Sequence, residues 1–220
     1  FAIGAQAGAE RVGNFALIDH EGVYHQLQKY GDSKAVVIIA TAANCQENIE
    51  KLPKYRLLRT TWESQGISFL AIDSASDSLD DIRLMDKLHN FDLPILVDDS
   101  QLVAENLGLS KAGEIIVLEP TRSQVLYRGG LDIDPVRARP GLDIEGVEGT
   151  TDFADVLATA VAGEAASLDH TVTTEAVGCE LQFPARESHA SAAPDYATEV
   201  APILEEKCLS CHIEGGIAPF

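Results

Sequence analysis

Short apolar runs recur through the first two thirds of the chain. The clearest is AVVIIAT at 35–41, where no charged side chain interrupts a series of β-branched and small residues. A continuous apolar run of this length is typical of a strand that is covered on both faces of a sheet. The pattern predicts strands at 35–41, 66–74 and 94–99, and a hairpin formed by 114–120 and 124–130.

Segments with apolar residues at helical spacing lie between these strands. The first is 47–65, in which Pro53 should introduce a kink. In the second, Ser78 can cap the first turn and acidic residues follow it, as is usual at a helix start. Helices are therefore predicted at 47–65, 78–90, 100–109 and 152–164. Alternation of strands and helices, followed by a hairpin and a closing helix, predicts an α/β fold with a central sheet.

Charge and hydropathy restrict the partners of the chain. Its net charge is −19, from 35 acidic and 16 basic residues. Because such a chain should repel nucleic acid and anionic lipid, we expect neutral or basic partners and no nucleic acid. No apolar run is long enough to predict a membrane span. The start of the chain lacks the features of a signal peptide, so we expect that one has been removed before Phe1.

The most specific motif lies near the end of the chain. Cys208, Cys211 and His212 have the C-x-x-C-H spacing that is typical of a c-type haem attachment site. The two thiols can add to the porphyrin vinyl groups, and the histidine can ligate the iron. A zinc site is the alternative, but Cys45 and Cys179 are isolated in the sequence and no histidine pair flanks them. We therefore expect one covalent haem c and a periplasmic or extracellular location.

Little of the chain remains to cover such a haem. A helix is expected at 196–207, before the motif, and the chain ends at Phe220. This is too short to bury a porphyrin. The chain is then a fragment of a longer protein, or a histidine of the main domain caps the haem, or the haem packs against another subunit in an oligomer or larger assembly. We also expect the Pro219 carbonyl to accept a hydrogen bond from His212 Nδ1, since metal-bound histidines usually donate their second ring nitrogen.

Longer stretches carry a family resemblance. VVIIATAANCQENIEKLPKYRLL resembles the active-site strand and helix of redoxins of the AhpC/TSA type, with Cys45 at the position of the reactive cysteine. VDDSQLVAENLGLSKAGEIIVLEPTRSQVLYRGGLD resembles the later half of the same thioredoxin-like fold, and the closing segments resemble extracytoplasmic proteins in which a redoxin domain is fused to a cytochrome c domain. The resemblance implies a thioredoxin-like domain at 1–165, a connecting segment at 166–194 and the start of a haem-binding unit at 195–220.

Three positions differ from those that thiol chemistry uses in this family. The second cysteine of the thioredoxin motif is replaced by Asn48. The threonine that peroxiredoxins have three residues before the reactive cysteine is replaced by Ala42, because Thr41 is one residue too early. The sequence KAGE at 111–114 has no proline where the fold usually has a cis-proline. We therefore expect the domain to be a poor or inactive peroxidase.

Three states are open for Cys45. A thiol at a helix N-terminus is stabilised as a thiolate, so Cys45 can be a reactive free cysteine. In an oxidising compartment it can instead pair with Cys179, the other cysteine outside the haem motif. Alternatively, both thiols are inert. The sequence alone does not choose among these states.

The haem motif leads to an expectation about function. We expect an electron-transfer protein rather than an enzyme, with the haem held on a redoxin-like scaffold and electrons passed to a redox partner protein. The first alternative is an oxidoreductase that acts through Cys45, as a thiol peroxidase or a thiol–disulfide oxidoreductase. The second alternative is a structural unit of a haem-containing assembly.

Overall fold

The computed structural model describes residues 10–131, 152–184 and 194–207. The chain divides into two compact units, Phe1–Gln182 and Phe183–Phe220. The first unit contains the sheet and the redoxin-like elements, and the second contains a short helical segment. Each unit is described by itself.

The first unit is built on a mixed sheet of six strands in the order β5-β4-β3-β6-β7-β8. β3 pairs in parallel with β4, and β4 in parallel with β5, whereas β6 runs antiparallel to both β3 and β7. The short β8 pairs in parallel with β7. The strands are β3 (Ala35–Thr41), β4 (Ile67–Asp73), β5 (Ile95–Val97), β6 (Ile115–Glu119), β7 (Gln124–Gly129) and β8 (Val172–Thr173). The prediction of an α/β fold with a central sheet is confirmed.

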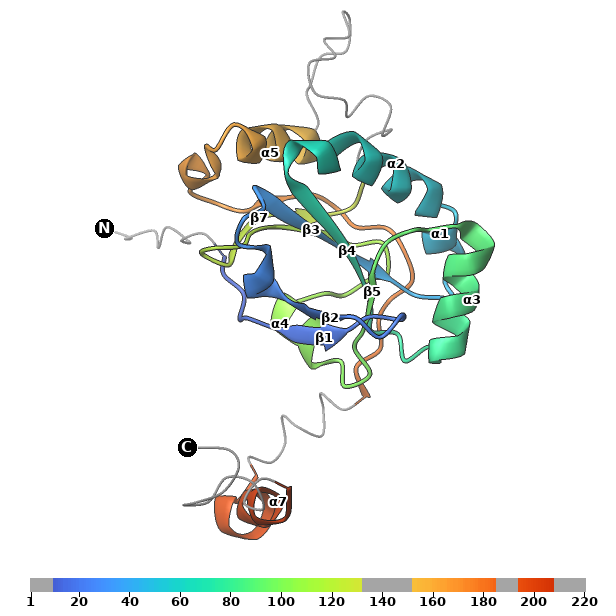
Figure 1. Cartoon of the computed structure of the whole chain (residues 1–220), viewed down its shortest axis with the longest axis vertical. Helices are drawn as coiled ribbons and strands as arrows, with labels where there is room; N and C mark the ends of the chain where they lie inside the picture. The colour runs from blue at the N-terminus through green and yellow to red at the C-terminus, as the bar shows by residue number, and fades with distance from the viewer. Residues whose placement is uncertain (1–9, 132–151, 185–193, 208–220) are drawn as a thin grey trace, which may run out of the picture. The chain divides into compact units, whose positions relative to one another are not determined.

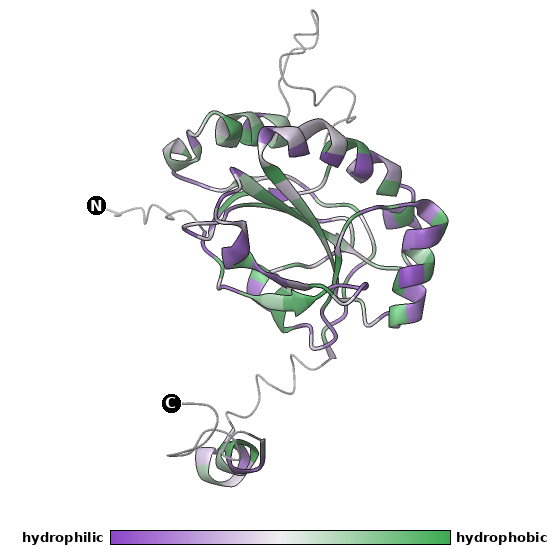
Figure 2. Ribbon diagram, viewed as in Figure 1, coloured by the Kyte–Doolittle hydropathy of each residue, from purple (hydrophilic) through white to green (hydrophobic). Residues whose placement is uncertain are grey.

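The apolar run of β3 lies at the centre of this sheet. All of its residues are buried, because β4 and β6 flank it and both of its faces are covered. Val37 and Ile39 belong to a core cluster that also contains residues of the helices, such as Tyr55, Trp62 and Phe153. Figure 2 shows the central strands as mostly hydrophobic and the helices around them as a mixture of hydrophilic and hydrophobic residues.

The helices cover the faces of this sheet. Figure 1 shows α2 and α5 over one face, with α3 beside the β5 edge. Buried residues of α2, α3 and α5 share one core cluster with the strands. The helices of the first unit are α1 (Gln46–Ile49), α2 (Leu52–Trp62), α3 (Leu79–His89), α4 (Leu102–Leu107) and α5 (Asp152–Val161), with short 3₁₀ segments η1 (Leu27–Tyr30), η2 (Glu63–Gln65) and η3 (Ala165–Ser167).

The predicted helix at 47–65 is divided into shorter elements. α1 ends at Ile49, α2 begins at Leu52, and Pro53 lies in the first turn of α2 rather than at an internal kink. Proline is tolerated in a first turn because the amide it lacks has no partner within the helix there. The interruption therefore comes just before the proline.

A hairpin that the sequence analysis did not predict lies against the β5 edge. It consists of β1 (Ala16–Ile18) and β2 (Tyr24–Gln26), which pair antiparallel. His20 N donates to Ile95 O at 2.9 Å, and Asp19 forms an isolated bridge with Leu96. The hairpin thus extends hydrogen bonding beyond the last strand of the sheet.

The second unit contains the helix that was predicted before the haem motif. A π-helical turn, η4 (Tyr196–Val200), continues into α7 (Ala201–Lys207). Asp195 caps this helix, since its carboxylate accepts from Thr198 N at 2.9 Å. Within the described ranges, none of the helices combines the length and the apolar character that crossing a bilayer would need.

Candidate active site

Cys45 lies where the central strand gives way to the first helix. β3 ends at Thr41, a short turn follows, and Cys45 is the residue immediately before α1. The Cys45 amide donates to Ala42 O at 3.2 Å, and the residue is only 1% exposed. The carboxyl ends of the parallel strands β3, β4 and β5 meet at this edge of the sheet. In α/β proteins this edge is the usual place for a functional site.

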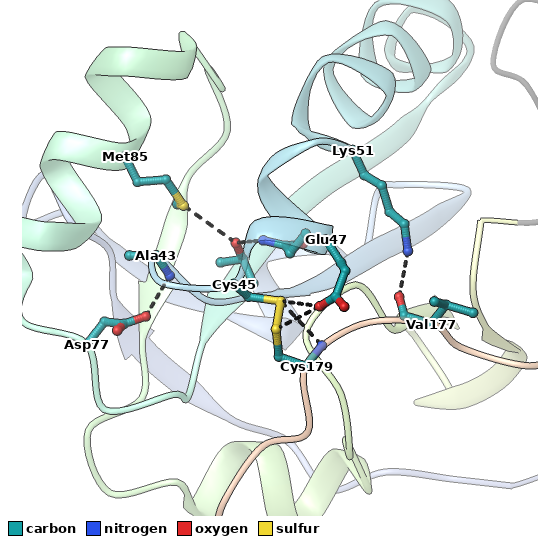
Figure 3. The surroundings of a disulfide bond; sticks show 10 residues. Ala43, Cys45, Glu47, Lys51, Asp77, Met85, Val177 and Cys179 are labelled. Carbon is teal, nitrogen blue, oxygen red and sulfur yellow. Dashed lines mark hydrogen bonds between the residues drawn. A yellow bond between two sulfur atoms is a disulfide. The ribbon is translucent and has the colours of Figure 1, made fainter.

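Cys45 forms a disulfide with Cys179 (Figure 3). The two residues are 134 positions apart in the sequence, and their Cα atoms are 5.9 Å apart. Cys45 is buried, whereas Cys179 is half-buried. Of the three states left open by the sequence, the structure therefore has the disulfide, and neither a free thiolate nor two inert thiols.

Cys179 reaches the site in a segment that we call the strap, residues 174–182. Backbone hydrogen bonds hold the strap beside the loop that precedes β6. Ala112 N donates to Cys179 O at 2.8 Å, and Leu181 N donates to Ser110 O at 2.8 Å. Because these bonds do not involve sulfur, they should hold Cys179 close to its partner when the disulfide is open.

Gly178 lets the strap approach this loop closely. A Cβ atom at Gly178 would overlap the carbonyl oxygen of Ala112.

We expect Gly178→Ala to displace the strap, to lower the free energy of unfolding by about 1–3 kcal/mol through overpacking, and to slow closure of the disulfide. The rate is measured by reoxidising the reduced protein and following the loss of free thiols. Gly31→Ala is the matched control, since Gly31 has a helical φ of −58° and its Cβ would meet only Gln28 O at 3.4 Å. Equal closure rates for the two variants would contradict the prediction.

A carboxylate that the sequence analysis missed lies beside both sulfur atoms. Glu47 Oε2 is 3.0 Å from Cys179 Sγ and 3.6 Å from Cys45 Sγ (Figure 3). Glu47 is exposed and lies in the first turn of α1. Its place two residues after Cys45 was visible in the sequence, but acids are common in first turns and nothing marked this one as part of a site.

Lys51 is a nearby cation. Lys51 Nζ donates to Val177 O in the strap at 2.5 Å. Burial lowers the pKa of Lys51, and the negative charge of Glu47 acts in the opposite direction. Lys51 therefore ties α1–α2 to the strap from the side on which Glu47 lies.

The hydroxyl of Thr41 is directed into the core and not toward the disulfide. It accepts a hydrogen bond from Asn48 Nδ2 at 2.7 Å and donates toward Met85 Sδ at 3.9 Å. Thr41 and Asn48 are both fully buried. The expected displacement of this hydroxyl from the reactive position is confirmed, and Asn48 occupies the position of the second thioredoxin cysteine as a buried hydrogen-bonding residue.

Asp77 fixes the turn before Cys45 and borders a pocket. Its carboxylate accepts from Ala43 N and from Asn44 Nδ2, both at 2.6 Å. The open pocket beside the disulfide has a volume of about 180 Å³, and its walls come from the turn, the strap and the loop after β4. Its lining residues are Ala42, Asn44, Cys45, Ala75, Asp77, Cys179, Glu180 and Leu181.

A second carboxyl, that of Asp73, is buried at the end of β4. Asp73 is 3% exposed and pairs in register with Thr41 of β3. Its Oδ1 accepts from Ala75 N at 3.2 Å, and among the described residues no hydrogen-bond partner is found for Oδ2. Burial, together with the nearby charge of Asp77, raises the pKa of Asp73 to about 7. A carboxyl that can hold a proton near neutral pH thus lies below the turn that carries Cys45.

The remaining sequence-predicted site residues cannot be placed. Cys208, Cys211, His212 and Pro219 lie outside the described residues. Haem attachment, the iron ligand and the Pro219 contact therefore stay predictions. Among the described residues no peptide bond is cis, and the loop KAGE, which has no proline, pairs with the strap instead.

The fold and the disulfide define a class: a thioredoxin-like α/β domain with a disulfide at the end of the central strand. The model of the AhpC/TSA family matches residues 9–134. The chain belongs to the AhpC/TSA family.

Solved structures share the fold at low sequence identity. An uncharacterized conserved protein from Geobacillus kaustophilus is 20% identical, with 82% of this chain and 94% of that chain covered and a TM-score of 0.59. Peroxidoxin BcpB from Mycobacterium tuberculosis is 19% identical, with 70% and 96% covered and a TM-score of 0.53. A putative thiol:disulfide interchange protein DsbE from Chlorobium tepidum is 13% identical, with 70% and 97% covered and a TM-score of 0.56. The comparison with curated proteins gave no match.

These findings correct the main functional expectation. The expectation of haem electron transfer on a redoxin-like scaffold is contradicted, because the chain belongs to the AhpC/TSA family and Cys45 forms a disulfide with Cys179. The family match ends at residue 134, and the similar structures give no support for a fused cytochrome c segment. The alternative that the sequence analysis kept, chemistry through Cys45, fits the structure better.

Proposed function

We propose that the chain carries out thiol–disulfide exchange with a partner protein through Cys45 and Cys179. The observation that carries the proposal is the disulfide itself, which joins the start of α1 to the strap beside an open pocket. Membership of the AhpC/TSA family supports sulfur chemistry at this position. In the exchange, a dithiol of the partner becomes a disulfide, and the Cys45–Cys179 bond takes up the two electrons and two protons to give two thiols.

The environment of the two sulfurs gives the exchange a direction. An incoming thiolate attacks Cys179, because Cys179 is half-buried and Cys45 is buried. The sulfur of Cys45 then leaves as a thiolate, and the Cys179 amide, 3.3 Å from Cys45 Sγ, donates to it. Hydrogen bonding to the charged form stabilises a thiolate leaving group. The carboxylate of Glu47 beside Cys179 disfavours a second negative charge there, which keeps the charge on Cys45.

The experiment is oxidation of a dithiol peptide by the oxidised protein. We expect loss of the peptide thiols with equimolar appearance of free thiols at Cys45 and Cys179, mapped by alkylation and mass spectrometry. Cys45→Ser should show no transfer. The proposal would be overturned if the folded, oxidised protein accepted no electrons from an excess of the dithiol peptide. Transfer that persists in Cys45→Ser would overturn it as well.

Thiol peroxidase activity is the second candidate, and family membership is the observation that favours it. The geometry opposes rapid peroxide reduction, because Thr41 donates to Met85 in the core and Ala42 has no hydroxyl to position a peroxide. Loss of one positioned polar group commonly slows a reaction by roughly a hundredfold or more. We therefore expect the reduced protein to form sulfenic acid at Cys45 only slowly with micromolar peroxide, as followed by dimedone labelling. Stoichiometric labelling within seconds would favour the peroxidase instead.

The partner and the compartment follow from charge and redox chemistry. The net charge of −19 and the acidic pocket residues Asp77 and Glu180 favour a neutral or basic partner protein. Stable disulfides are typical of oxidising compartments. An extracytoplasmic location, periplasmic or extracellular, is accordingly part of this proposal.

Covalent haem c at Cys208 and Cys211 is a separate prediction. Thioether bonds survive denaturation, so we expect the Soret absorbance to stay with the polypeptide after acid–acetone extraction of the full chain. A mass that exceeds the polypeptide mass by one haem gives an independent check. Colourless protein with the unmodified mass, obtained from a host that attaches haem c, would refute the prediction.

A further inference from the structure

Three metal-ligating atoms meet at the disulfide. The sulfurs of Cys45 and Cys179 and one carboxylate oxygen of Glu47 all lie within 4.8 Å of one another. We propose that the reduced chain binds one Zn²⁺ through Cys45, Cys179 and Glu47, at a site that exists only while the disulfide is open. This goes beyond disulfide exchange, because the same residues would then hold a ligand in one redox state and not in the other.

The geometry requires only a small rearrangement of the sulfurs. Zinc bound tetrahedrally at its usual distance from sulfur keeps two thiolates about 3.8 Å apart. Opening the disulfide lets the two sulfurs separate by side-chain rotation. The Glu47 oxygen already lies 3.0 Å from one sulfur and 3.6 Å from the other, so it faces the space into which the ion would enter.

The backbone holds the three ligands in place without the disulfide. Cys45 and Glu47 lie on the same turn at the start of α1. Cys179 is fixed by the hydrogen bond from Ala112 N to its carbonyl, and Lys51 Nζ holds the adjacent Val177 carbonyl. The site is therefore largely formed before the ion arrives, which reduces the entropy cost of binding.

Charge favours a cation at this point. Two thiolates and a carboxylate would place three negative charges together, in a chain whose net charge is already −19. Lys51, the cation that interacts with Glu47, has its ammonium group on the strap carbonyl and does not lie between the sulfurs. Thiolate ligands favour zinc over the hard cations Mg²⁺ and Ca²⁺.

The pocket leaves a fourth coordination position accessible. Cys45 and Cys179 line it together with Asp77 and Glu180. A zinc ion with three protein ligands generally keeps a water or a substrate atom in the fourth position. The pocket of about 180 Å³ provides room for that water.

Zinc binding follows reduction of the disulfide. A dithiol reductant supplies two electrons and two protons, which convert the disulfide into two thiols, and becomes a disulfide itself. Zn²⁺ then displaces the two thiol protons, because coordinated thiols are deprotonated. The bound ion occupies both thiolates, so reoxidation to the disulfide requires that it leave.

The test uses the full chain with Cys208→Ser and Cys211→Ser, which leaves Cys45 and Cys179 as the remaining two of the 4 cysteines. The protein is reduced, equilibrated with Zn²⁺ without oxygen, and analysed for zinc per chain and for protection of the thiols from alkylation. We expect one zinc per reduced chain and none on the oxidised chain. Cd²⁺ should give thiolate charge-transfer absorbance in the same way.

Glu47→Gln should weaken zinc binding by roughly tenfold or more, since the carboxylate is a direct ligand. Glu50→Gln is the matched control, because Glu50 lies just after α1 and its carboxylate accepts from Gln46 rather than facing the sulfurs. Equal zinc binding by the reduced and oxidised chains, equal affinities of the Glu47 and Glu50 variants, or no bound zinc would each overturn the proposal.

Two further measurements separate the failure of zinc binding from misfolding of the variant and from failure of disulfide exchange. If the serine variant folds poorly, the titration is repeated on the wild-type chain, and the protected cysteines are mapped by mass spectrometry. Disulfide transfer to the dithiol peptide is measured without zinc. Transfer without zinc binding would overturn only the metal site, and zinc binding without transfer would overturn only the exchange function.

Discussion

Cys179→Ser should abolish disulfide transfer and lower the free energy of unfolding by about 2–4 kcal/mol. Transfer stops because the Cys45–Cys179 disulfide is the group that takes up the two electrons of the partner dithiol, and Cys45 alone cannot form it. Stability falls because the disulfide joins residues 134 positions apart and restricts the unfolded chain. For a chain of this size the melting temperature should fall by roughly 5–15 °C. Peptide oxidation and thermal unfolding measure the two effects.

The control for this prediction is the wild-type chain under reducing conditions. It should unfold at nearly the same temperature as Cys179→Ser, because both lack the cross-link and keep the backbone bonds of the strap. The variant should also leave the masses of the peptide and the protein unchanged, because two thiols form no disulfide without an oxidant. A variant that still oxidises the peptide would contradict the role of the cross-link in transfer, and a variant that unfolds at the same temperature as the oxidised wild type would contradict its role in stability.

Asp73→Asn should stabilise the chain progressively as pH rises from about 4 to about 7. The pKa of Asp73 in the folded chain is raised to about 7, from an ordinary 3.8. Between these values the unfolded chain has lost the proton and the folded chain still holds it, so stability of the wild type falls as pH rises. Asparagine has no charge to bury, so it avoids this loss. The shift corresponds to roughly 4 kcal/mol at most.

Denaturant unfolding of the wild type and the variant at pH 4, 6 and 8 measures this effect. The two proteins should be similar at pH 4 and differ most at pH 8. Asp32→Asn, at an exposed position, is the matched control and should leave the pH dependence unchanged. A difference between wild type and Asp73→Asn that is the same at all three pH values would contradict the linkage.

Local patterns predicted the elements that are long and strongly buried. The run at 35–41 became β3 with the same bounds, and the Ser78 cap was confirmed by the hydrogen bond from Asp81 N to its hydroxyl. The hairpin β1–β2 was missed because its strands are three residues long and partly exposed, so they show no clear alternation. β8 has only two residues and depends on β7 for its conformation.

The sequence predicted the position of the reactive cysteine but not the residues that surround it in the fold. Cys45 was identified by the resemblance of its segment to the active-site strand and helix of AhpC/TSA redoxins, but its partner stayed open because the strap has no periodic pattern that would locate Cys179. Glu47 and Asp77 were missed, since an acid near a helix start is common and only the tertiary fold brings these carboxylates to the sulfurs. The raised pKa of Asp73 likewise depends on burial that no local sequence signal shows.

The hairpin at the β5 edge has a consequence for association between chains. An open edge strand offers free backbone groups to which another chain can add, which leads to aggregation. Here His20 and Asp19 occupy that edge through their contacts with Ile95 and Leu96. The ring of His25 connects the hairpin to η1: its Nε2 lies 2.8 Å from Asp19 Oδ2, and its Nδ1 lies 2.6 Å from the Tyr30 hydroxyl. Intermolecular strand addition at this edge should therefore begin with detachment of the hairpin, at a cost set by these few polar contacts rather than by unfolding of the core.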